Sequence, residues 1–264
     1  MKVEFFRWPA EVASGRLRGS IIQRELLDMG IQRGRDVVIA SKHGWPDSAV
    51  VGAGKLVFDV CDDHFSGPHA AHYVNWCRSA DAVTCNTSGM ARVIQHATGR
   101  TATVIGEPHE QPECEPRINE HLLWFGHRSN LDDLQRVLPS LGERPITVLT
   151  NLPTEGPVKR WTREAMDAAF ERCGLVILPT GRRQAKSANR AVESIRRGLF
   201  VVAEPLPAYS ELGVWIGDIA QGVQWALSHQ EDALMRVAVA QAYVAEEFSP
   251  RRIAEQWLTF FESL

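Results

Sequence analysis

Short apolar segments alternate with amphipathic segments of helical period along almost the whole chain. In the first half, apolar segments rich in β-branched residues and bounded by Gly, Pro, Asp or Asn predict strands at 2–7, 36–41, 55–61, 81–86 and 101–106. Between them, apolar positions that recur every three to four residues predict helices at 17–29, 68–79 and 87–97. Strands separated by helices pair in parallel through right-handed crossovers, so this half predicts an α/β unit with a parallel sheet.

The same alternation restarts in the second half of the chain. Strands are predicted at 121–127, 146–151, 174–180 and 200–205, and helices at 130–141, 158–173 and 186–198. The remainder is expected to be helical, and its last helix should begin with Ser249 as the cap and Pro250 in the first turn. The pattern therefore predicts two α/β units in tandem.

Residues 107–119, EPHEQPECEPRIN, separate the two halves. Three prolines and four glutamates without a period are typical of a linker. In open α/β sheets, ligands bind at the carboxyl ends of the strands, so residues that follow a strand are the first candidates for chemistry.

Composition narrows the class of protein. A hydrophobic fraction of 44% and a charged fraction of 23% are those of an ordinary globular protein, and a net charge of −3 does not indicate general attraction to polyanions. No apolar segment approaches the ~18 residues of a membrane-spanning helix, and the N-terminus lacks a signal peptide's apolar core. Five scattered cysteines without a C-x-x-C pair favour free thiols, so we expect a cytoplasmic location.

The stretch GRRQAKSANRAVES, which follows the strand at 174–180, carries four cations and one carboxylate. A helix start offers free N–H groups and the positive end of the helix dipole, so it predicts an anion site for a diphosphate. The residues expected to line that site are Pro179, Thr180, Arg182, Lys186, Ser187 and Asn189, with Ser187 as the helix cap. Glu193 lies two turns into the helix, about 9 Å along its axis, which suits a sugar hydroxyl attached to the phosphates. The alternative is the solvated face of a surface helix.

A second candidate is FGHRSN, after the strand at 121–127. Gly126 allows the chain to turn, and His127 and Arg128 would point toward the same ligand. Arg128 is a candidate phosphate clamp, and the alternative is an exposed loop arginine.

The first half offers candidates for a second substrate. Gly15 permits close approach to a ligand, and Arg16 and Arg18 either bind an anion or are solvated. Further candidates follow the second and third strands: Lys42, His43, Asp62, Asp63 and His64. A carboxylate beside an imidazole suits a general base, whereas their adjacent spacing is poor for a metal, so no metal is expected. The absence of G-x-S-x-G and P-loop motifs leaves a hydrolase or a P-loop NTPase without support.

The segment KSANRAVESIRRGLFVVAEPLPAYSEL resembles the donor-site helix, strand and following loop of GT-B glycosyltransferases, specifically the family 4-like retaining group in a compact phage or bacterial form. DAVTCNTSGMARVI and SPRRIAEQWLTFF resemble other parts of that fold. The resemblance implies two Rossmann-like domains facing a cleft, an acceptor-side domain at 1–114 and a nucleotide-sugar domain at 115–248. The helix at 249–264 would pack back on the first domain.

The same resemblance implies roles for single residues. Glu193 matches the second glutamate of a pair with seven residues between them, which implies contact with the donor's ribose hydroxyls. At the first position the family has a glutamate that contacts the transferred sugar, whereas this chain has Ala185. Arg128 and Lys186 would hold the leaving diphosphate, and Gly15 would approach it from the first domain. With Asp63 and His64, these two cations make up the expected catalytic set.

The resulting hypothesis is a metal-independent, retaining, hexosyltransferase-like enzyme without a cofactor. Its donor would be a nucleotide diphosphate sugar, UDP-glucose or a related compound. Its acceptor would be a hydroxyl of a hydroxymethylated pyrimidine in DNA, or of a glycan or lipid-linked molecule. The alternative is a non-catalytic nucleotide-sugar-binding protein, which Ala185 favours. The sequence does not specify the oligomeric state.

Overall fold

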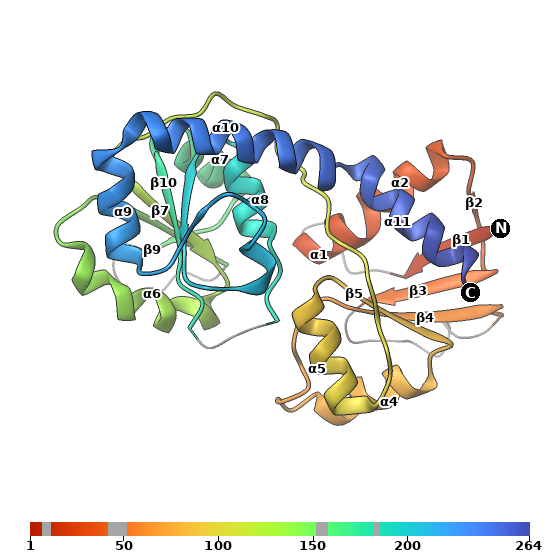
Figure 1. The fold of residues 1–264 in the computed structure, drawn as a ribbon. Coiled ribbons are helices and arrows are strands. Elements are labelled where there is room, and N and C mark those ends of the chain that lie inside the picture. Colours follow the sequence, from red (N-terminus) through yellow and green to blue (C-terminus); the bar gives the residue numbers. More distant parts are fainter. Residues whose placement is uncertain (7–11, 42–51, 152–157, 182–184) are drawn as a thin grey trace. The chain divides into compact units, whose positions relative to one another are not determined.

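A computed structural model describes residues 1–6, 12–41, 52–151, 158–181 and 185–264. The chain divides into two compact units, each built around its own six-stranded parallel sheet (Figure 1). Unit 1 comprises Met1–Glu110, Gln184–Ser187 and Glu247–Leu264, and unit 2 comprises Gln111–Arg183 and Ala188–Glu246. The predicted α/β class with parallel sheets is confirmed.

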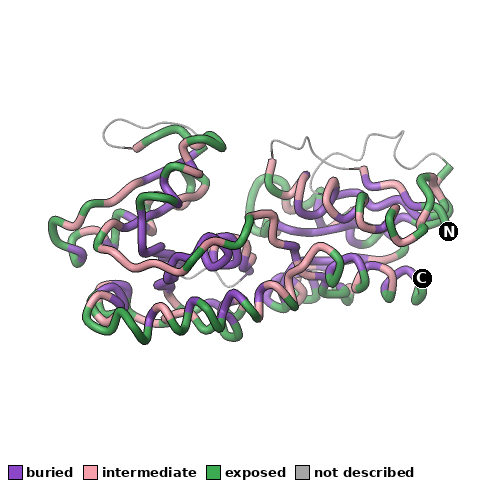
Figure 2. The backbone as a smooth tube through the Cα atoms, turned by 90° about the horizontal axis from the view of Figure 1, so that it is seen from above, coloured by how far each residue is buried: buried purple, intermediate pink, exposed green. Residues whose placement is uncertain are grey.

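Unit 1 contains a sheet in the strand order β2-β1-β3-β4-β5-β6. Its strands are β1 (Lys2–Phe6), β2 (Gln32–Arg33), β3 (Val37–Ser41), β4 (Lys55–Val60), β5 (Ala82–Cys85) and β6 (Thr103–Val104). Its helices are α1 (Ala13–Gly15), the π-helical turn η1 (Arg16–Ser20), α2 (Ile21–Asp28), α4 (Ala70–Ser79), α5 (Ser88–Thr98) and α11 (Pro250–Glu262). The strands β3 and β4 are buried almost throughout (Figure 2), as expected for a sheet that is covered on both faces.

The helix α11 belongs to unit 1 although it is the last element of the chain. Ser249 accepts a hydrogen bond from the Arg252 N–H and Pro250 opens the helix, so the predicted cap is confirmed. Trp257 is fully buried and meets Phe5 edge to face, with ring centroids 5.4 Å apart. The aromatic side chains of α11 thus fill the core on one face of this sheet.

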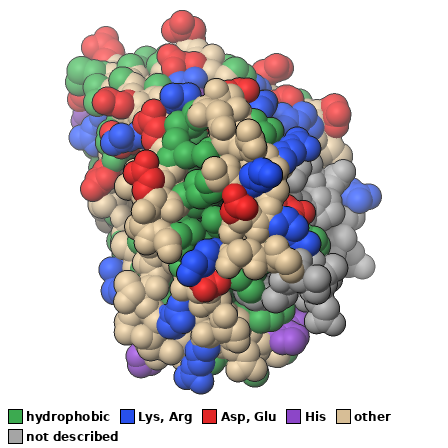
Figure 3. Space-filling model, turned by 90° about the vertical axis from the view of Figure 1, so that its right-hand side faces the viewer, with side chains coloured by type: hydrophobic (Ala, Val, Ile, Leu, Met, Phe, Trp, Pro, Cys, Tyr) green, Lys and Arg blue, Asp and Glu red, His purple; other side chains and the backbone are tan. Residues whose placement is uncertain are grey.

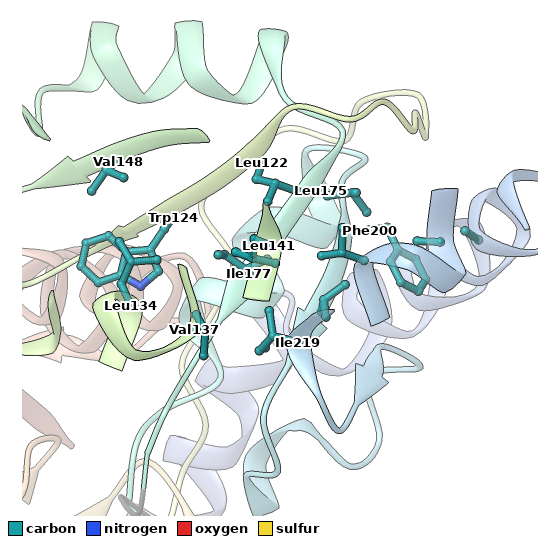
Figure 4. Packing of buried hydrophobic residues seen from close by; sticks show 14 of the residues in the cluster. Leu122, Trp124, Leu134, Val137, Leu141, Val148, Leu175, Ile177, Phe200 and Ile219 are labelled. Atoms are coloured by element: carbon teal, nitrogen blue, oxygen red, sulfur yellow. The ribbon is translucent and has the colours of Figure 1, made fainter. Parts of the chain in front are cut away.

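Unit 2 contains a sheet in the order β12-β11-β10-β7-β8-β9. Its strands are β7 (Leu122–Gly126), β8 (Ile146–Thr150), β9 (Val158–Arg160), β10 (Leu175–Leu178), β11 (Phe200–Ala203) and β12 (Trp215–Ile216). Its helices are η2 (Arg128–Asn130), α6 (Leu131–Val137), η3 (Leu138–Leu141), α7 (Arg163–Arg172), α8 (Asn189–Arg196), η4 (Pro207–Tyr209), α9 (Ile219–Ser228) and α10 (Gln230–Glu247). Trp124, Ile177 and Phe200 from three neighbouring strands pack together with side chains of α6 and α9 (Figure 4).

Three local predictions were wrong. The predicted helix at 158–173 begins with the strand β9, and α7 starts only at Arg163, where Thr162 caps it by accepting from the Ala165 N–H. The segment after β11 is not wholly helical, because it contains β12. Ser187 does not cap α8: Ala188 occupies the cap position without a side-chain bond, and the Ser187 side chain hydrogen-bonds to Glu107 instead.

A buried ion pair lies at the centre of unit 1. Arg18 is 1% exposed, and its guanidinium binds both carboxylate oxygens of Asp59, with the Nε–Oδ2 distance at 3.0 Å. It also donates to the main-chain oxygens of Ile105 and Gly106. Asp59 is further satisfied by the hydroxyls of two neighbouring strands, Ser41 on β3 and Thr84 on β5. The pair joins η1 to the middle of the sheet and to the segment after β6.

Glu107 lies beside this pair and is 5% exposed. The Asn86 side-chain amide donates to its Oε2 at 3.3 Å. Burial raises the pKa of the Glu107 carboxyl above its ordinary value, although nearby Arg18 and the Ser187 hydrogen bond act against that shift. In both units, no helix within the described ranges is long and apolar enough to cross a membrane.

The Arg18–Asp59 pair predicts a non-additive effect of mutation on stability. Arg18→Met should lower the free energy of unfolding by about 3–5 kcal/mol, because it leaves the Asp59 carboxylate buried without its cation. The double variant Arg18→Met/Asp59→Leu should lose less, since no uncompensated charge remains. Urea unfolding measures both, with the exposed Arg24→Met as a control that should stay within ~0.5 kcal/mol of the parent. A double variant as unstable as the sum of the single changes would contradict this prediction.

Glu107 predicts a pH dependence of stability. Because its pKa is raised in the folded state, the native protein binds this proton more tightly than the unfolded chain does. The free energy of unfolding should therefore fall as pH rises upward from the ordinary value of 4.5. Glu107→Gln removes the titrating carboxyl. The free energy of unfolding of the variant should therefore rise relative to that of the parent through this pH range, and the difference should persist at higher pH. A difference that stays constant with pH would show that Glu107 is not the source.

Candidate functional site

The carboxyl edge of the sheet in unit 2 brings several predicted residues together. Gly126 ends β7 and leads to His127 and Arg128, while Pro179 and Thr180 follow β10. The pairing of Leu175 with Leu122 fixes the register of these two neighbouring strands. When that register is continued, Pro179 stands beside Gly126.

Arg190 ties the first turn of α8 to this edge. Its Nη1 donates to the Phe125 carbonyl oxygen at 3.0 Å. A Cβ at Gly126 would come within 3.2 Å of the same nitrogen, so the glycine gives the guanidinium room against the backbone. Arg190 also lies beside the fully buried Tyr209: burial raises the pKa of that phenol, and the guanidinium offsets part of the shift.

Glu193 lies one turn further along α8 and is only 8% exposed. Its Oε2 accepts a hydrogen bond from the Gln111 N–H at 3.0 Å. The following residues of that segment also run along the helix, where the Cys114 N–H donates to the Arg196 carbonyl oxygen. Glu193 is thus held against main chain, a contact that the sequence analysis did not predict.

Glu204 follows β11 and was missed by the sequence analysis. Its Oε2 accepts from the Thr180 and Gly181 N–H groups, both at 2.9 Å, and both of its oxygens bind Arg136 at 2.7 Å. Partial burial acts to raise the pKa of Glu204, but these hydrogen bonds outweigh it and hold the pKa below its usual range. The only signal in the sequence is an acidic residue directly after a buried strand.

The polar groups of the loops along this edge differ in their hydrogen bonding. Thr180 is buried, and its hydroxyl finds no hydrogen-bond partner among the described residues. His127 and Arg128 are exposed. The Arg128 N–H donates to Asn151 Oδ1 at 2.9 Å, and His127 Nδ1 accepts from the Ser129 N–H at 3.2 Å. The loop is therefore fixed through its backbone, while the Arg128 side chain extends outward.

The predicted residues of unit 1 fall into two groups. Asp62 and Asp63 are exposed directly after β4, and the His64 ring is 4.9 Å from the Tyr73 ring. Gly15 is buried at the end of α1, and Arg16 forms a bidentate pair with Glu110 at 2.7 and 2.8 Å.

Arg18 requires a correction. It was a candidate acceptor-binding residue, but its guanidinium is buried and its donors are directed to Asp59 and two carbonyl oxygens. The prediction was wrong because the helical period of this segment turns Arg18 inward, toward a carboxylate that the sequence pattern does not connect with it.

The segment before α8 groups with unit 1. Ala185 is buried in an apolar cluster with Phe58 and Cys85, and Lys186 and Ser187 fall in the same unit. Asn189, the first residue of α8, belongs to unit 2. Lys42, His43 and Arg182 lie outside the described residues. Within the described ranges no group of three or more His, Cys, Asp or Glu side chains is arranged to hold a metal ion.

No protein family model matches the chain, and no curated protein matches it in sequence. Solved structures do match. HepE of Anabaena, in complex with UDP and glucose, is similar over 92% of this chain and 81% of its own, with a TM-score of 0.68 and 18% identity. A glycosyltransferase from Rickettsia africae is similar over 92% of this chain and 81% of its own, with a TM-score of 0.61 and 12% identity.

A third match is α,α-trehalose 6-phosphate synthase of Burkholderia multivorans. It is similar over 97% of this chain and 78% of its own, with a TM-score of 0.57 and 11% identity. Identities this low establish the fold alone. The chain has two α/β units, each with a parallel sheet, and is similar to these structures over most of its length. The protein therefore has the GT-B fold of glycosyltransferases.

Proposed function

We propose that the chain is a glycosyltransferase that moves a sugar from a UDP-linked donor to a hydroxyl group. The supporting observation is the contact between Arg190 and the end of β7, which joins the Gly126–Arg128 loop to the helix that carries Glu193. A cation-bearing loop and a hydroxyl-binding carboxylate thereby share one edge of the sheet in unit 2. HepE has this fold and is known in complex with UDP-glucose, which favours a uridine nucleotide.

The proposed roles in unit 2 follow from the charge that develops on the leaving group. Breaking the sugar–phosphate bond builds negative charge on the diphosphate, and fixed cations stabilise that charge without a metal. Arg128 extends from a loop whose backbone is fixed by Asn151, so it is the proposed clamp of this unit. Lys186 of the segment before α8 is a further cation in the proposed catalytic set. Glu193 would accept the ribose hydroxyls.

In unit 1, Asp62, Asp63 and His64 form the proposed acceptor side. A carboxylate and an imidazole there can accept the proton that the attacking hydroxyl loses. Retention of configuration at the sugar is part of the proposal and rests on the resemblance of the α8 segment to the retaining family. In this proposal, retention of configuration does not depend on a covalent nucleophile of the protein.

The charges of unit 1 favour a neutral hydroxyl acceptor, a glycan or lipid-linked sugar, over DNA. Arg16 is neutralised by Glu110 and Arg18 by Asp59, so two cations that would have served a nucleic-acid backbone are occupied. On the face in Figure 3, basic and acidic side chains of the described residues are interspersed around a hydrophobic strip.

The second candidate function is nucleotide-sugar binding without transfer. It is favoured by Ala185, which packs into an apolar cluster where the resembling family has a sugar-binding glutamate. Transfer would then need another group to hold the sugar.

Incubation with a panel of nucleotide sugars and acceptors tests the proposal. We expect UDP-glucose or a related donor to add one hexose to a glycan or lipid-linked acceptor, detected by mass, with the α- or β-linkage of the donor retained in the product as measured by NMR. Hydroxymethylated DNA belongs in the panel as the competing acceptor. UDP binding without transfer to any acceptor would favour the binding protein. Absence of binding to every nucleoside diphosphate would contradict both candidates.

A further inference from the structure

Arg190 was not among the predicted site residues, yet its surroundings differ from those of the other arginines near α8. Arg196 at the end of α8 and Arg197 directly after it are ion-paired with Glu113 and Asp167, and Arg136 is ion-paired with Glu204. Among the described residues Arg190 forms no ion pair. Its Nη1 donates to the Phe125 carbonyl oxygen, and the guanidinium also hydrogen-bonds to the Tyr209 phenol. A guanidinium has five N–H donors, so donors remain beyond those that serve Phe125 and Tyr209.

The place of this guanidinium suits an anion. It lies at the carboxyl ends of parallel strands, where ligands of open α/β sheets bind. It is half-buried, and a partly desolvated cation without a carboxylate is costly unless an anion joins it. Gly126 lets the guanidinium lie against the backbone at the end of β7. The Thr180 hydroxyl, which follows β10 at the same edge of the sheet, is buried without a partner in the described part of the chain.

We infer that Arg190 binds the diphosphate of the nucleotide donor. This inference rests on the proposed function and adds a residue that precedes Glu193 by one turn of α8. The hydrogen bond to Phe125 fixes one nitrogen and thereby aims the rest of the fork, which leaves a planar pair of donors for two phosphate oxygens. Arg190 would thus hold the phosphates and Glu193 the ribose, from the same face of one helix.

Calorimetric titration with uridine, UMP and UDP separates this role from a structural one. In the parent protein, affinity should rise from uridine to UDP. Arg190→Gln should reduce the UDP affinity by about 10- to 100-fold, as expected for charge-assisted hydrogen bonds, and leave the uridine affinity within about twofold. Arg236→Gln is the matched control, because it removes the same charge from α10, where Arg236 packs on Trp225.

Arg190→Lys keeps the charge but cannot serve Phe125 and two phosphate oxygens together. Its ratio of UDP to uridine affinity should fall between those of the parent and Arg190→Gln, and this variant carries the test if the glutamine variant does not fold. Equal loss of uridine and UDP affinity, or an unchanged ratio in Arg190→Lys, would contradict the role of Arg190. A parent protein that binds uridine and UDP equally would contradict it as well. A parent that binds no uridine nucleotide would instead overturn the proposed function.

Discussion

In each unit every strand runs parallel to its neighbours, and this constraint decides where chemistry can occur. Each connection must cross a face of the sheet, so the loops that follow the strands collect along one edge. The central strands β3, β10 and β11 are buried and carry no charged residue, so in their neighbourhood the charged groups lie in the loops and helices that follow them. Arg128, Thr180, Arg190 and Glu204 of unit 2 all lie along or against this edge.

The way these charges are paired divides them into structural and functional groups. The Arg18–Asp59 pair and the Arg136–Glu204 pair are satisfied within the protein and fix the backbone around them. Glu204 occupies two main-chain N–H groups that would otherwise be available to a bound anion, so the proposed anion site is assigned to side chains without a carboxylate partner. Within the described ranges, Arg190 and Arg128 are arginines near Gly126 without an ion pair, and the proposed donor site is built on them.

Much of the fold could be predicted because buried parallel strands leave a local signal. LVIL is a continuous apolar segment between Gly174 and Pro179, FVVA is one between Leu199 and Glu204, and both form central strands. The two-residue strands β2 and β12 were missed because so short a segment has no period, and their pairing depends on a neighbour distant in sequence. The start of α8 was misjudged for a similar reason: Ser187 is a good cap residue by type, but a buried carboxyl elsewhere in the chain takes its hydroxyl.

The candidate site was less predictable than the fold. Glu193 stood out because it is a carboxylate in a helix that follows a strand, but its bond to Gln111 joins residues 82 positions apart. The burial of Arg18 and the clamp formed by Glu204 likewise depend on partners that the local pattern cannot connect. Arg190 was counted only as one of four cations, and what distinguishes it is the absence of an ion pair among the described residues, which requires the three-dimensional arrangement.

The central claim is that α8 presents Glu193 to the ribose of a uridine nucleotide. Calorimetric titration with UDP and 2′-deoxy-UDP tests it most directly. The parent protein should prefer UDP by about 1–3 kcal/mol, because the deoxy compound leaves part of the carboxylate's hydrogen bonding unmet. Glu193→Gln should reduce this preference while the protein stays folded, as judged by circular dichroism. If the parent and Glu193→Gln prefer UDP over 2′-deoxy-UDP to the same extent, the account is contradicted.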